Sequence, residues 1–371
     1  MKVLVYGTGF AGQGHCDAFR TAGAEVVGIV GRTESVVTEV AAKKGIAFAG
    51  TDWAAALAQC QPDIVSIATP GGAHFDVSME AMEQGCHVFC DKPMAESAVN
   101  TKKMQLKAMQ MGVKTAFASS FRYMPEIIHA KQLVESGAIG EPLEAECISH
   151  FGLDPAIPLG WSHRLSQGGG RLNNNFTHLM SIATYVIGER ILSVQGQVRN
   201  DMPKAPIVEG VHNFIERRNF IPQDLNDPEL QWGEADAEWS YTVMAKLESA
   251  TPAAQPVSVL FKHGGITPRF QDDHIVFYGS KGAIFIKGNY GKGPLFLSQD
   301  RGDWQEIKTP ADITTALPAI EDDTQRSWTY LAQMLVDDAN GKAVEPYQGF
   351  EIGSKYQEII EAIRAEELWT G

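Results

Sequence analysis

The 371-residue sequence lacks the features that mark several classes of protein. It has no apolar run near the ~18 residues that a membrane-spanning helix requires. Its first residues, Met1–Gly7, lack the longer apolar region of a signal peptide. Its five cysteines are odd in number and show no paired CxxC spacing, which argues against a disulfide scaffold and favours free thiols in a reducing compartment. We therefore expect a cytoplasmic protein.

Basic residues are scarce relative to acidic ones. There are 31 Lys and Arg against 45 Asp and Glu, a formal net charge of −14. Such a chain has no long-range attraction for nucleic acid or anionic lipid, so neither is expected as a partner. The ten histidines show no HExxH or paired metal-ligand spacing, so no metal site is expected. The negative net charge does not exclude a local basic pocket for one small anion.

The length favours two domains, and the pattern of apolar runs changes near residue 123. Before that point, short runs rich in Val, Ile and Phe alternate with helical stretches, which predicts a parallel sheet covered on both faces. The expected strands are Val3–Tyr6, Glu25–Val30, Ile64–Ala68, His87–Cys90 and Lys114–Ala118, and the expected helices are 11–22, 35–44, 52–59, 74–84 and 97–111. Right-handed crossovers narrow this half to a doubly wound Rossmann α/β fold.

After residue 123 the strand-like segments come in runs, which is typical of an antiparallel sheet. They follow one helix, Pro125–Ser136, and lie at 143–151, 192–200, 239–248, 256–262, 274–279 and 283–287. Residues 201–237, rich in Pro, Asn and acidic residues, are expected to form an extended excursion or lid. The predicted units are a dinucleotide-binding Rossmann domain at 1–122, an α+β domain with an open, mostly antiparallel sheet at 123–349, and a C-terminal helix within 350–371 that packs near the first domain.

The first strand runs directly into Gly7-Thr8-Gly9-Phe10-Ala11-Gly12, a GxGxxG motif that opens the first helix. A strand before it and a helix after it are the context in which this motif binds a dinucleotide. Gly7 allows the tight turn, Gly9 lets the backbone approach a pyrophosphate, and Gly12 lets helix and strand pack closely. The helix N-terminus would add N–H groups for the phosphates. We expect this loop, with Phe10, to contact the cofactor.

The end of the second strand bears on the choice of cofactor. Where an Asp or Glu would bind the ribose 2′-hydroxyl, the chain has Gly31-Arg32-Thr33, with no carboxylate before Glu34. Arg32 could pair with a 2′-phosphate, and Thr33 could add a hydroxyl. Alternatively, Arg32 stacks on adenine or points to solvent. NADP is therefore favoured, and NAD stays open as the alternative.

Two further segments follow strands at the carboxyl edge of the predicted sheet, where ligands bind in open α/β folds. Thr69, Pro70 and His74 follow one strand, and Asp91-Lys92-Pro93 follows the next. A lysine fixed at this edge, with proline stiffening the backbone, can hydrogen-bond a reacting hydroxyl and, if desolvated, act as acid or base. By itself Asp-Lys-Pro is also a common turn. We expect these residues to contact the cofactor, and Lys92 also the substrate.

From the glycine motif to the helix at 174–187, the chain resembles the Gfo/Idh/MocA oxidoreductase family. The family's Glu-Lys-Pro appears here as Asp91-Lys92-Pro93. The resemblance implies that Lys92 is catalytic and that its peptide bond to Pro93 is often cis. It also implies that the open sheet of the second domain forms the sugar site and often a subunit interface, so a homo-oligomer is expected.

A second segment, Gly168–His178, looks like the family's Gly-Gly-Gly-x-x-x-Asp-x-x-x-His-x-x-Asp pattern. His178 matches the family's catalytic or substrate-binding histidine, whereas Asn174 and Ser181 stand where the pattern has aspartates. A carboxylate would stabilise the charged form of His178, while Asn and Ser can only orient it. The resemblance implies catalysis by Lys92 with His178 as partner and Asn174 as orienter.

Helical spacing points to the same segment without the resemblance. Apolar residues cover a wide arc of the helix, which is therefore expected to be largely buried. Asn174, His178, Ser181 and Tyr185 fall at i, i+4, i+7 and i+11, a single polar stripe. Buried polar groups need partners. A bound polyol would supply them, and an internal hydrogen-bond network is the alternative.

Other candidates rest on position or on weaker resemblance. Arg122-Tyr123-x-Pro125 resembles the family's Arg-aromatic-x-Pro segment at the active-site cleft, and Trp161 and Arg164 resemble a Trp-Arg pair near the nicotinamide, with two residues interposed. His150 ends a strand of the second domain and could line the sugar site. The resulting assignments are Arg122, Trp161 and Arg164 to the cofactor, and Tyr123, His150, Arg171, Asn174 and His178 to the substrate.

The leading functional hypothesis is an NAD(P)-dependent oxidoreductase that moves a hydride between nicotinamide and a carbinol or carbonyl carbon of a sugar, cyclitol or related polyol. One alternative is redox-neutral glycoside hydrolysis through transient C3 oxidation and elimination, with His150, His163 and Tyr123 as candidate acids or bases. The second is a sugar- or redox-sensing regulator without turnover, against which Lys92 and His178 argue.

Charge in the substrate is a separate question. Arg122, Arg164, Arg171 and Lys262 could face an anionic group such as a carboxylate or sulfonate. Solvated surface charges are the ordinary alternative for such residues.

Overall fold

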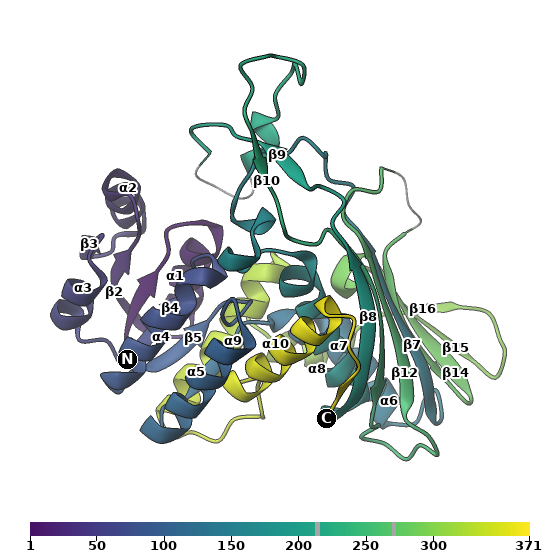
Figure 1. Cartoon of the computed structure of the whole chain (residues 1–371). Coiled ribbons are helices and arrows are strands. Elements are labelled where there is room, and N and C mark those ends of the chain that lie inside the picture. Colours follow the sequence, from purple (N-terminus) through teal and green to yellow (C-terminus); the bar gives the residue numbers. More distant parts are fainter. Residues whose placement is uncertain (212–215, 269–271) are drawn as a thin grey trace.

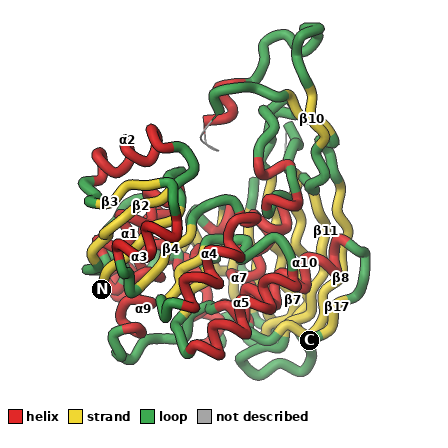
Figure 2. Tube along the Cα trace, turned by 60° about the vertical axis from the view of Figure 1, so that its left-hand side comes forward, coloured by secondary structure: helices red, strands yellow, loops and turns green. Residues whose placement is uncertain are grey.

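The computed structural model describes residues 1–211, 216–268 and 272–371. Two large sheets dominate the molecule (Figure 1): a six-stranded sheet in the N-terminal part and a nine-stranded sheet in the C-terminal part. Helices lie between and around them, and Figure 2 shows the same arrangement from another side. All five cysteines are buried free thiols. In the described part of the chain, no helix is both long and apolar enough to cross a membrane.

The N-terminal sheet is parallel throughout, in the order β3-β2-β1-β4-β5-β6. Its strands are β1 (Lys2–Tyr6), β2 (Glu25–Val30), β3 (Phe48–Gly50), β4 (Ile64–Ile67), β5 (His87–Cys90) and β6 (Thr115–Phe117). Its helices are α1 (Phe10–Thr21), α2 (Glu34–Lys44), α3 (Trp53–Cys60), α4 (His74–Glu83) and α5 (Ala98–Met111). The strand order reverses between β1 and β4, which makes this edge the place where a ligand binds in such sheets. The predicted Rossmann fold is confirmed.

The central strands of this sheet are apolar because they are buried. Every residue of β4 is buried, because helices cover both faces of the sheet. Edge strand β3 is only three residues long and partly exposed, and the sequence analysis did not predict it. A strand this short carries no periodic signal of its own.

The C-terminal sheet is mixed, in the order β16-β15-β14-β13-β7-β12-β11-β8-β17. Its strands are β7 (Pro142–His150), β8 (Ile191–Arg199), β11 (Ser240–Leu247), β12 (Val257–Gly264), β13 (His274–Gly279), β14 (Gly282–Lys287), β15 (Leu295–Gln299), β16 (Gln305–Ile307) and β17 (Trp369–Thr370). All its pairs are antiparallel except β7 with β12. The prediction of a mostly antiparallel sheet is therefore confirmed. Strands β15, β16 and β17 were not predicted.

Five helices accompany this sheet in sequence: α6 (Pro125–Glu135), α7 (Thr177–Ile187), α8 (Ala311–Ala316), α9 (Asp323–Ala339) and α10 (Phe350–Arg364). Helices α7 and α10 contact one face of the nine-stranded sheet, and among the described residues Figure 1 shows no helix on the opposite face. Every residue of α7 except Tyr185 is buried, as its apolar arc predicts. Helix α10 also packs on α5, while α9 packs on α1 of the N-terminal part.

The excursion predicted at 201–237 contains a two-stranded antiparallel sheet, β9 (Lys204–Pro206) with β10 (Trp232–Glu234). Together with the described residues between these strands, it projects beyond the rest of the molecule in Figure 1. Residues 212–215 lie outside the described part. The buried guanidinium of Arg217 donates to the carbonyl of Pro158 (3.3 Å) and to the hydroxyl of Ser162 (3.0 Å), which ties the base of the excursion to the body.

Candidate active site

The glycine loop after β1 has the geometry that a dinucleotide requires. Gly7 has a φ of +126°, and a Cβ there would lie 2.5 Å from the carbonyl oxygen of Ala68. A Cβ on Gly12 would lie 1.9 Å from the carbonyl oxygen of Gly7, so only glycine allows this helix start. At Gly9 nothing lies within 4 Å of the Cβ position, which leaves the backbone open to an approaching group. The loop therefore fits a pyrophosphate at the first turn of α1.

Phe10 and the end of β2 flank this loop. The exposed Phe10 ring packs at 5.5 Å against Trp328 of α9, so α9 supports the glycine loop. Arg32 and Thr33 are exposed, and Thr33 occupies the N-cap position of α2 without a side-chain cap. A hollow of about 250 Å³ lies at the same edge, lined by side chains that include Glu34. The edge thus offers both a basic and an acidic side chain to a ribose.

His74 joins the two segments that follow β4 and β5. One ring nitrogen lies 2.7 Å from the carbonyl oxygen of Thr69, and the other lies 2.8 Å from that of Pro93. The ring is fully buried, and burial lowers its pKa. His74 therefore holds the Thr69–Pro70 turn against the Lys92–Pro93 segment, and it acts on any cofactor through those segments. The Lys92–Pro93 bond is cis, as the resemblance implies.

Lys92 follows the carboxyl end of β5 and is partly exposed. Desolvation lowers the pKa of Lys92 below its ordinary value of 10.5, Asp91 opposes this shift, and Arg171 adds to it. Asp91 uses one carboxylate oxygen to accept the backbone N–H of Lys92 (2.8 Å). Burial therefore favours the neutral amine, the form that can accept a proton.

His178 lies in an aromatic pocket next to this lysine. Its ring stacks on Phe121 at 4.3 Å and meets the edge of Tyr290 at 5.3 Å. Burial is the main cause that lowers the pKa of His178 well below its ordinary value, and Lys92 and Lys292 add to it. In the described part of the chain, no carboxylate raises the pKa of His178 against these effects. His178 is therefore a neutral imidazole.

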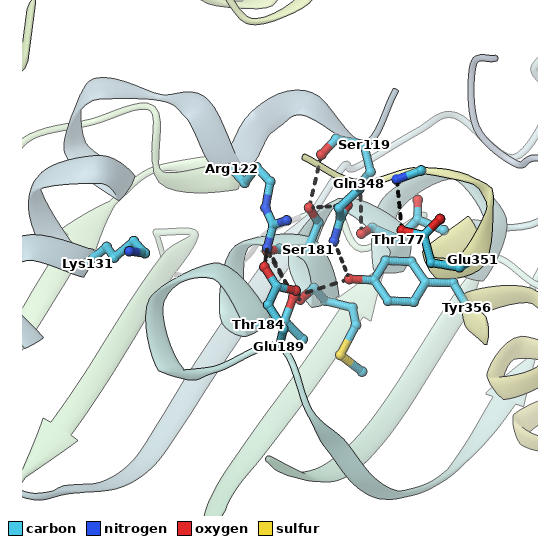
Figure 3. Close-up of polar contacts among 12 residues, drawn as sticks. Ser119, Arg122, Lys131, Thr177, Ser181, Thr184, Glu189, Gln348, Glu351 and Tyr356 are labelled. Carbon is cyan, nitrogen blue, oxygen red and sulfur yellow. Dashed lines mark hydrogen bonds and ion pairs between the residues drawn. The ribbon is translucent and has the colours of Figure 1, made fainter. Parts of the chain in front are cut away.

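The polar stripe predicted on α7 is correct only in part. Residues Leu172–Phe176 form a π-helical turn, so Asn174 and His178 are not separated by one α-helical turn. The hydroxyl of Ser181 donates to the carbonyl of Ser119 (3.0 Å) and to Gln348 (2.9 Å), as Figure 3 shows. Tyr185 packs against the guanidinium of Arg122 and the ammonium of Lys131. Protein groups thus satisfy the Ser181 hydroxyl, so a bound polyol is not required there, and the ring of Tyr185 packs against two cations.

Arg122 and Tyr123 are both buried among protein groups. Nη2 of Arg122 donates to the carbonyl of Ser181 (3.1 Å) and to Glu189 (2.6 Å), which ties the segment before α6 to α7 (Figure 3). Tyr123 is buried in the core against Tyr185 and Tyr330 of α9. These contacts give both side chains a role in packing, and their expected contacts with cofactor and substrate stay predictions.

Arg171 belongs to a second buried network, which consists of hydrogen bonds. Its Nε donates to Nε2 of His263 (3.2 Å), and the other ring nitrogen of His263 lies 2.7 Å from the hydroxyl of Ser149. Asn175 donates to Ser149 (3.1 Å) and to the hydroxyl of Tyr290 (2.9 Å). This network links β7, β12 and the π-helical turn to the pocket of His178. Its members His263, Asn175 and Tyr290 carry no sequence motif and were not predicted.

The remaining residues expected in the site are His150, Trp161, Arg164 and Asn174. His150 lies next to Asp273. One carboxylate oxygen of Asp273 accepts the backbone N–H of His150 at 2.8 Å and lies 3.3 Å from Nδ1 of its ring. Trp161 is partly exposed and begins a short 3-10 turn, and Arg164 after it is exposed. Asn174 is partly exposed on the π-helical turn. Buried His163, a candidate acid or base, has its pKa lowered to about 4 by burial and by Arg217.

Comparison with known proteins covers both halves of the chain. Residues 1–119 match the oxidoreductase family with an NAD-binding Rossmann fold, and residues 127–285 match the Gfo/Idh/MocA C-terminal domain. Levoglucosan dehydrogenase of Pseudarthrobacter phenanthrenivorans is 29% identical over 178 residues, 47% of this chain and 45% of that protein. D-Glucoside 3-dehydrogenase of Escherichia coli is 29% identical over 195 residues, 51% of this chain and 54% of that protein. The chain thus spans about half the length of these two relatives.

The fold is shared over the whole chain with solved structures. A levoglucosan dehydrogenase in complex with NADH and L-sorbose has a TM-score of 0.81 at 20% identity, with 100% of this chain and 98% of that chain covered. Both sheets therefore have counterparts in that structure.

Proposed function

Since the chain belongs to the Gfo/Idh/MocA oxidoreductase family, we propose that it is an NAD(P)-dependent dehydrogenase or reductase. Its substrate would be a sugar, cyclitol or related polyol with a reacting carbinol or carbonyl carbon. The observation that carries the proposal is the desolvated Lys92 at the carboxyl edge of the Rossmann sheet, beside the neutral His178. The relatives named for levoglucosan and D-glucoside support the class of substrate.

A nicotinamide bound at the glycine loop would supply the hydride donor or acceptor. In the oxidation direction, the neutral amine of Lys92 accepts the proton of the reacting hydroxyl. In the reduction direction, its ammonium form returns that proton. His178 is neutral, so it orients the hydroxyl by a hydrogen bond, and we assign Asn174 to the same task. The aromatic rings of Phe121 and Tyr290 exclude water from this pocket.

For the cofactor, we propose a preference for NADP through Arg32 and Thr33, with NAD as the alternative. The support is the exposed guanidinium at the end of β2, which is free to meet a 2′-phosphate. Glu34, next to it, favours NAD, because a carboxylate repels a 2′-phosphate and accepts bonds from ribose hydroxyls. Titration of the protein with NADPH and NADH separates the two.

We also propose a cytoplasmic homo-oligomer that forms through the free face of the nine-stranded sheet. Strand register places mostly apolar side chains in one row across that face: Met244, Leu260, Glu146, Val276, Phe285 and Phe296. A second copy would cover this row. Size-exclusion chromatography with light scattering tests the assembly, and a monomeric Met244→Asp variant would locate the interface.

One assay tests the proposed reaction. Free sugars, cyclitols and glycosides are incubated with NADP⁺ or NAD⁺, and reduced-nicotinamide absorbance and product NMR are followed in the same tube. We expect one reduced cofactor per product. Sugar released from a glycoside without net cofactor change would instead identify a redox-neutral glycoside hydrolase. Ligand binding without any product would identify a sugar-sensing regulator.

A further inference from the structure

Three basic side chains surround the proposed reaction centre: Lys92 after β5, Arg171 before the π-helical turn, and Lys292 after a short turn at Asn289–Gly291. Lys92 and Lys292 both lower the pKa of His178, and Arg171 lowers that of Lys92, so the three basic side chains act on one pocket. Within the described residues, none of the three forms a salt bridge with a carboxylate. With Lys92 held as the neutral amine, the positive charges at this pocket are those of Arg171 and Lys292, and positive charge that is partly shielded from water is costly unless an anion balances it.

The carboxylates near this pocket have other partners. Glu238 forms a salt bridge with Arg364 (2.9 Å) and accepts the backbone N–H of Leu172. Asp273 pairs with His150 (3.3 Å). Neither of these carboxylates forms a salt bridge with Lys292 or Arg171 in the described part of the chain. Asp91 raises the pKa of Lys92 and uses one carboxylate oxygen for the backbone N–H of that residue.

Acidic residues at the start of α9 lie near Lys292 but do not bind it directly in this structure. Asp322 accepts the backbone N–H of Gln325 as the N-cap of α9, and Asp323 forms a salt bridge with Arg326. Both raise the pKa of Lys292, against the larger effect of desolvation, which lowers it. The contact of Lys292 with this segment is a long hydrogen bond of 3.4 Å to the hydroxyl of Thr324.

Lys292 is placed where a substrate could reach it. The residue is exposed, and its Nζ lies 4.6 Å from the centre of the Phe121 ring. The same ring stacks on His178 at 4.3 Å. Phe121 thus connects the proposed orienting histidine with an accessible ammonium group. Arg171 is 2% exposed and bound to His263, so it contributes to the positive field without offering a free surface.

We propose that the polyol substrate carries a carboxylate, as a uronic or aldonic acid does, and that Lys292 binds this carboxylate while Lys92 acts on the hydroxyl. This inference rests on the proposed function, since it names the substrate class of the same site. A single accessible ammonium matches a singly charged group. A phosphate would be better matched by several donors converging on it. Neither Asn174 nor Ser181 adds negative charge that would repel the carboxylate.

Binding to the full chain saturated with NADPH or NADH tests this proposal. By calorimetry, D-glucuronate and D-galacturonate are compared with D-glucose and D-galactose, and glucose 6-phosphate serves as the other kind of anion. We expect the preferred acid to bind about tenfold or more tightly than its neutral counterpart. Lys292→Met should remove that preference, while Lys292→Arg should retain most of it.

A matched control is Lys342→Met, which removes a surface lysine that pairs with Asp337 beyond the far end of α9. That helix has 17 residues, so Lys342 lies about 25 Å from the Lys292 side. The control should leave the preference for the acid unchanged. If Lys342→Met lowers it as much as Lys292→Met, the effect is one of net charge and the proposal is wrong.

Other results of these binding experiments also test the proposal. Acids that bind no better than neutral sugars, a stronger preference for glucose 6-phosphate, or an equal loss of acid and neutral binding in Lys292→Met would each overturn the carboxylate site. Neutral sugars that reduce cofactor without any preference for acids would leave the proposed function standing. Acids that bind through Lys292 without any cofactor reduction would instead overturn the proposed function alone.

Discussion

Replacement of Arg122 by methionine distinguishes a structural role from the cofactor-binding role that the sequence suggests. Arg122 is 2% exposed, and its Nη2 donates to the carbonyl of Ser181, the hydroxyl of Thr184 and the carboxylate of Glu189. Methionine keeps most of the apolar stem but removes the guanidinium. We expect the variant to be less stable and to bind nucleotide normally, because these contacts run to α7 and Glu189.

The magnitude follows from the separate contacts. The bond from the buried cation to the carbonyl of Ser181 contributes roughly 1.5–3 kcal/mol. Glu189 is 55% exposed, so its ion pair adds at most about 1 kcal/mol after solvent screening. The bond to Thr184 is long, at 3.4 Å, and adds little. Arg122→Met should therefore lower the free energy of unfolding by roughly 2–4 kcal/mol, and Glu189→Gln by less than about 1 kcal/mol.

Urea unfolding followed by tryptophan fluorescence measures this difference, and titration with NADH or NADPH measures nucleotide affinity. The reasoning fails if Arg122→Met unfolds at the same urea concentration as the unmodified protein while its nucleotide dissociation constant rises tenfold. That result would support the cofactor-binding role of Arg122. Equal destabilisation by Arg122→Met and Glu189→Gln would also contradict it, because the exposed partner would then carry the interaction.

Three further changes test the site and the core. Lys92→Met should lower kcat by about 10²- to 10⁴-fold with unchanged nucleotide affinity; normal turnover, measured by cofactor absorbance, would exclude Lys92 as the proton-transfer group. Arg32→Ala should weaken NADPH binding by about 1.5–3 kcal/mol and NADH binding less, and equal losses in the two titrations would contradict the NADP preference. Burial lowers the pKa of His15 from 6.5 to about 4, so the unfolded chain binds a proton that the folded chain does not, and stability falls as the pH drops from 6.5 towards 4. His15→Asn should reduce this slope by about 1.4 kcal/mol per pH unit, and an unchanged slope in urea unfolding at several pH values would count against it.

The N-terminal half could be predicted from sequence because its signals are local. The glycine motif lies between a strand and a helix, and the alternation of short apolar runs with helices specifies a parallel sheet. Expected and observed limits of β2 and β5 agree to the residue. The parallel pairing of β7 with β12 has no such signal, because more than 100 residues separate the two strands and only the packed sheet brings them together.

Helix α9 was missed although the sequence contains its signals. Asp322 stands at the N-cap, where its carboxylate accepts the N–H of Gln325. Trp328, Leu331, Ala332 and Leu335 follow at the spacing of one buried helical face. This helix supports the glycine loop through the contact of Trp328 with Phe10. A search for caps in the C-terminal part would therefore have found it.

The site was predicted in part. Lys92 and His178 follow from motifs and do occur in one pocket. Lys292, Phe121 and Tyr290 belong to no motif, and only the tertiary fold brings them to His178. The expected polar stripe assumed a regular α-helix, and the π-helical turn at Leu172–Phe176 alters that geometry at Asn174.

The absence of charge at Asn174 and Ser181 determines which group titrates in the reaction. A carboxylate at either position would favour imidazolium at His178, whereas burial and two nearby lysines hold the pKa of His178 well below 6.5. This shift favours a neutral His178, which leaves proton transfer to Lys92. Lys92 must be neutral to accept the hydroxyl proton, and its pKa lies below 10.5.

The rate of oxidation should consequently follow a single ionisation. kcat/KM should rise with pH and level off above the pKa of Lys92, with no second limb near pH 6.5. His178→Asn should lower the rate without changing the shape of the profile, because a neutral residue that orients the hydroxyl is replaced by another neutral residue. A limb near pH 6.5 that disappears in His178→Asn would show instead that the imidazole titrates during the reaction. In that case a counter-charge reaches His178 when substrate binds, and the acid–base assignment would pass from Lys92 alone to the pair.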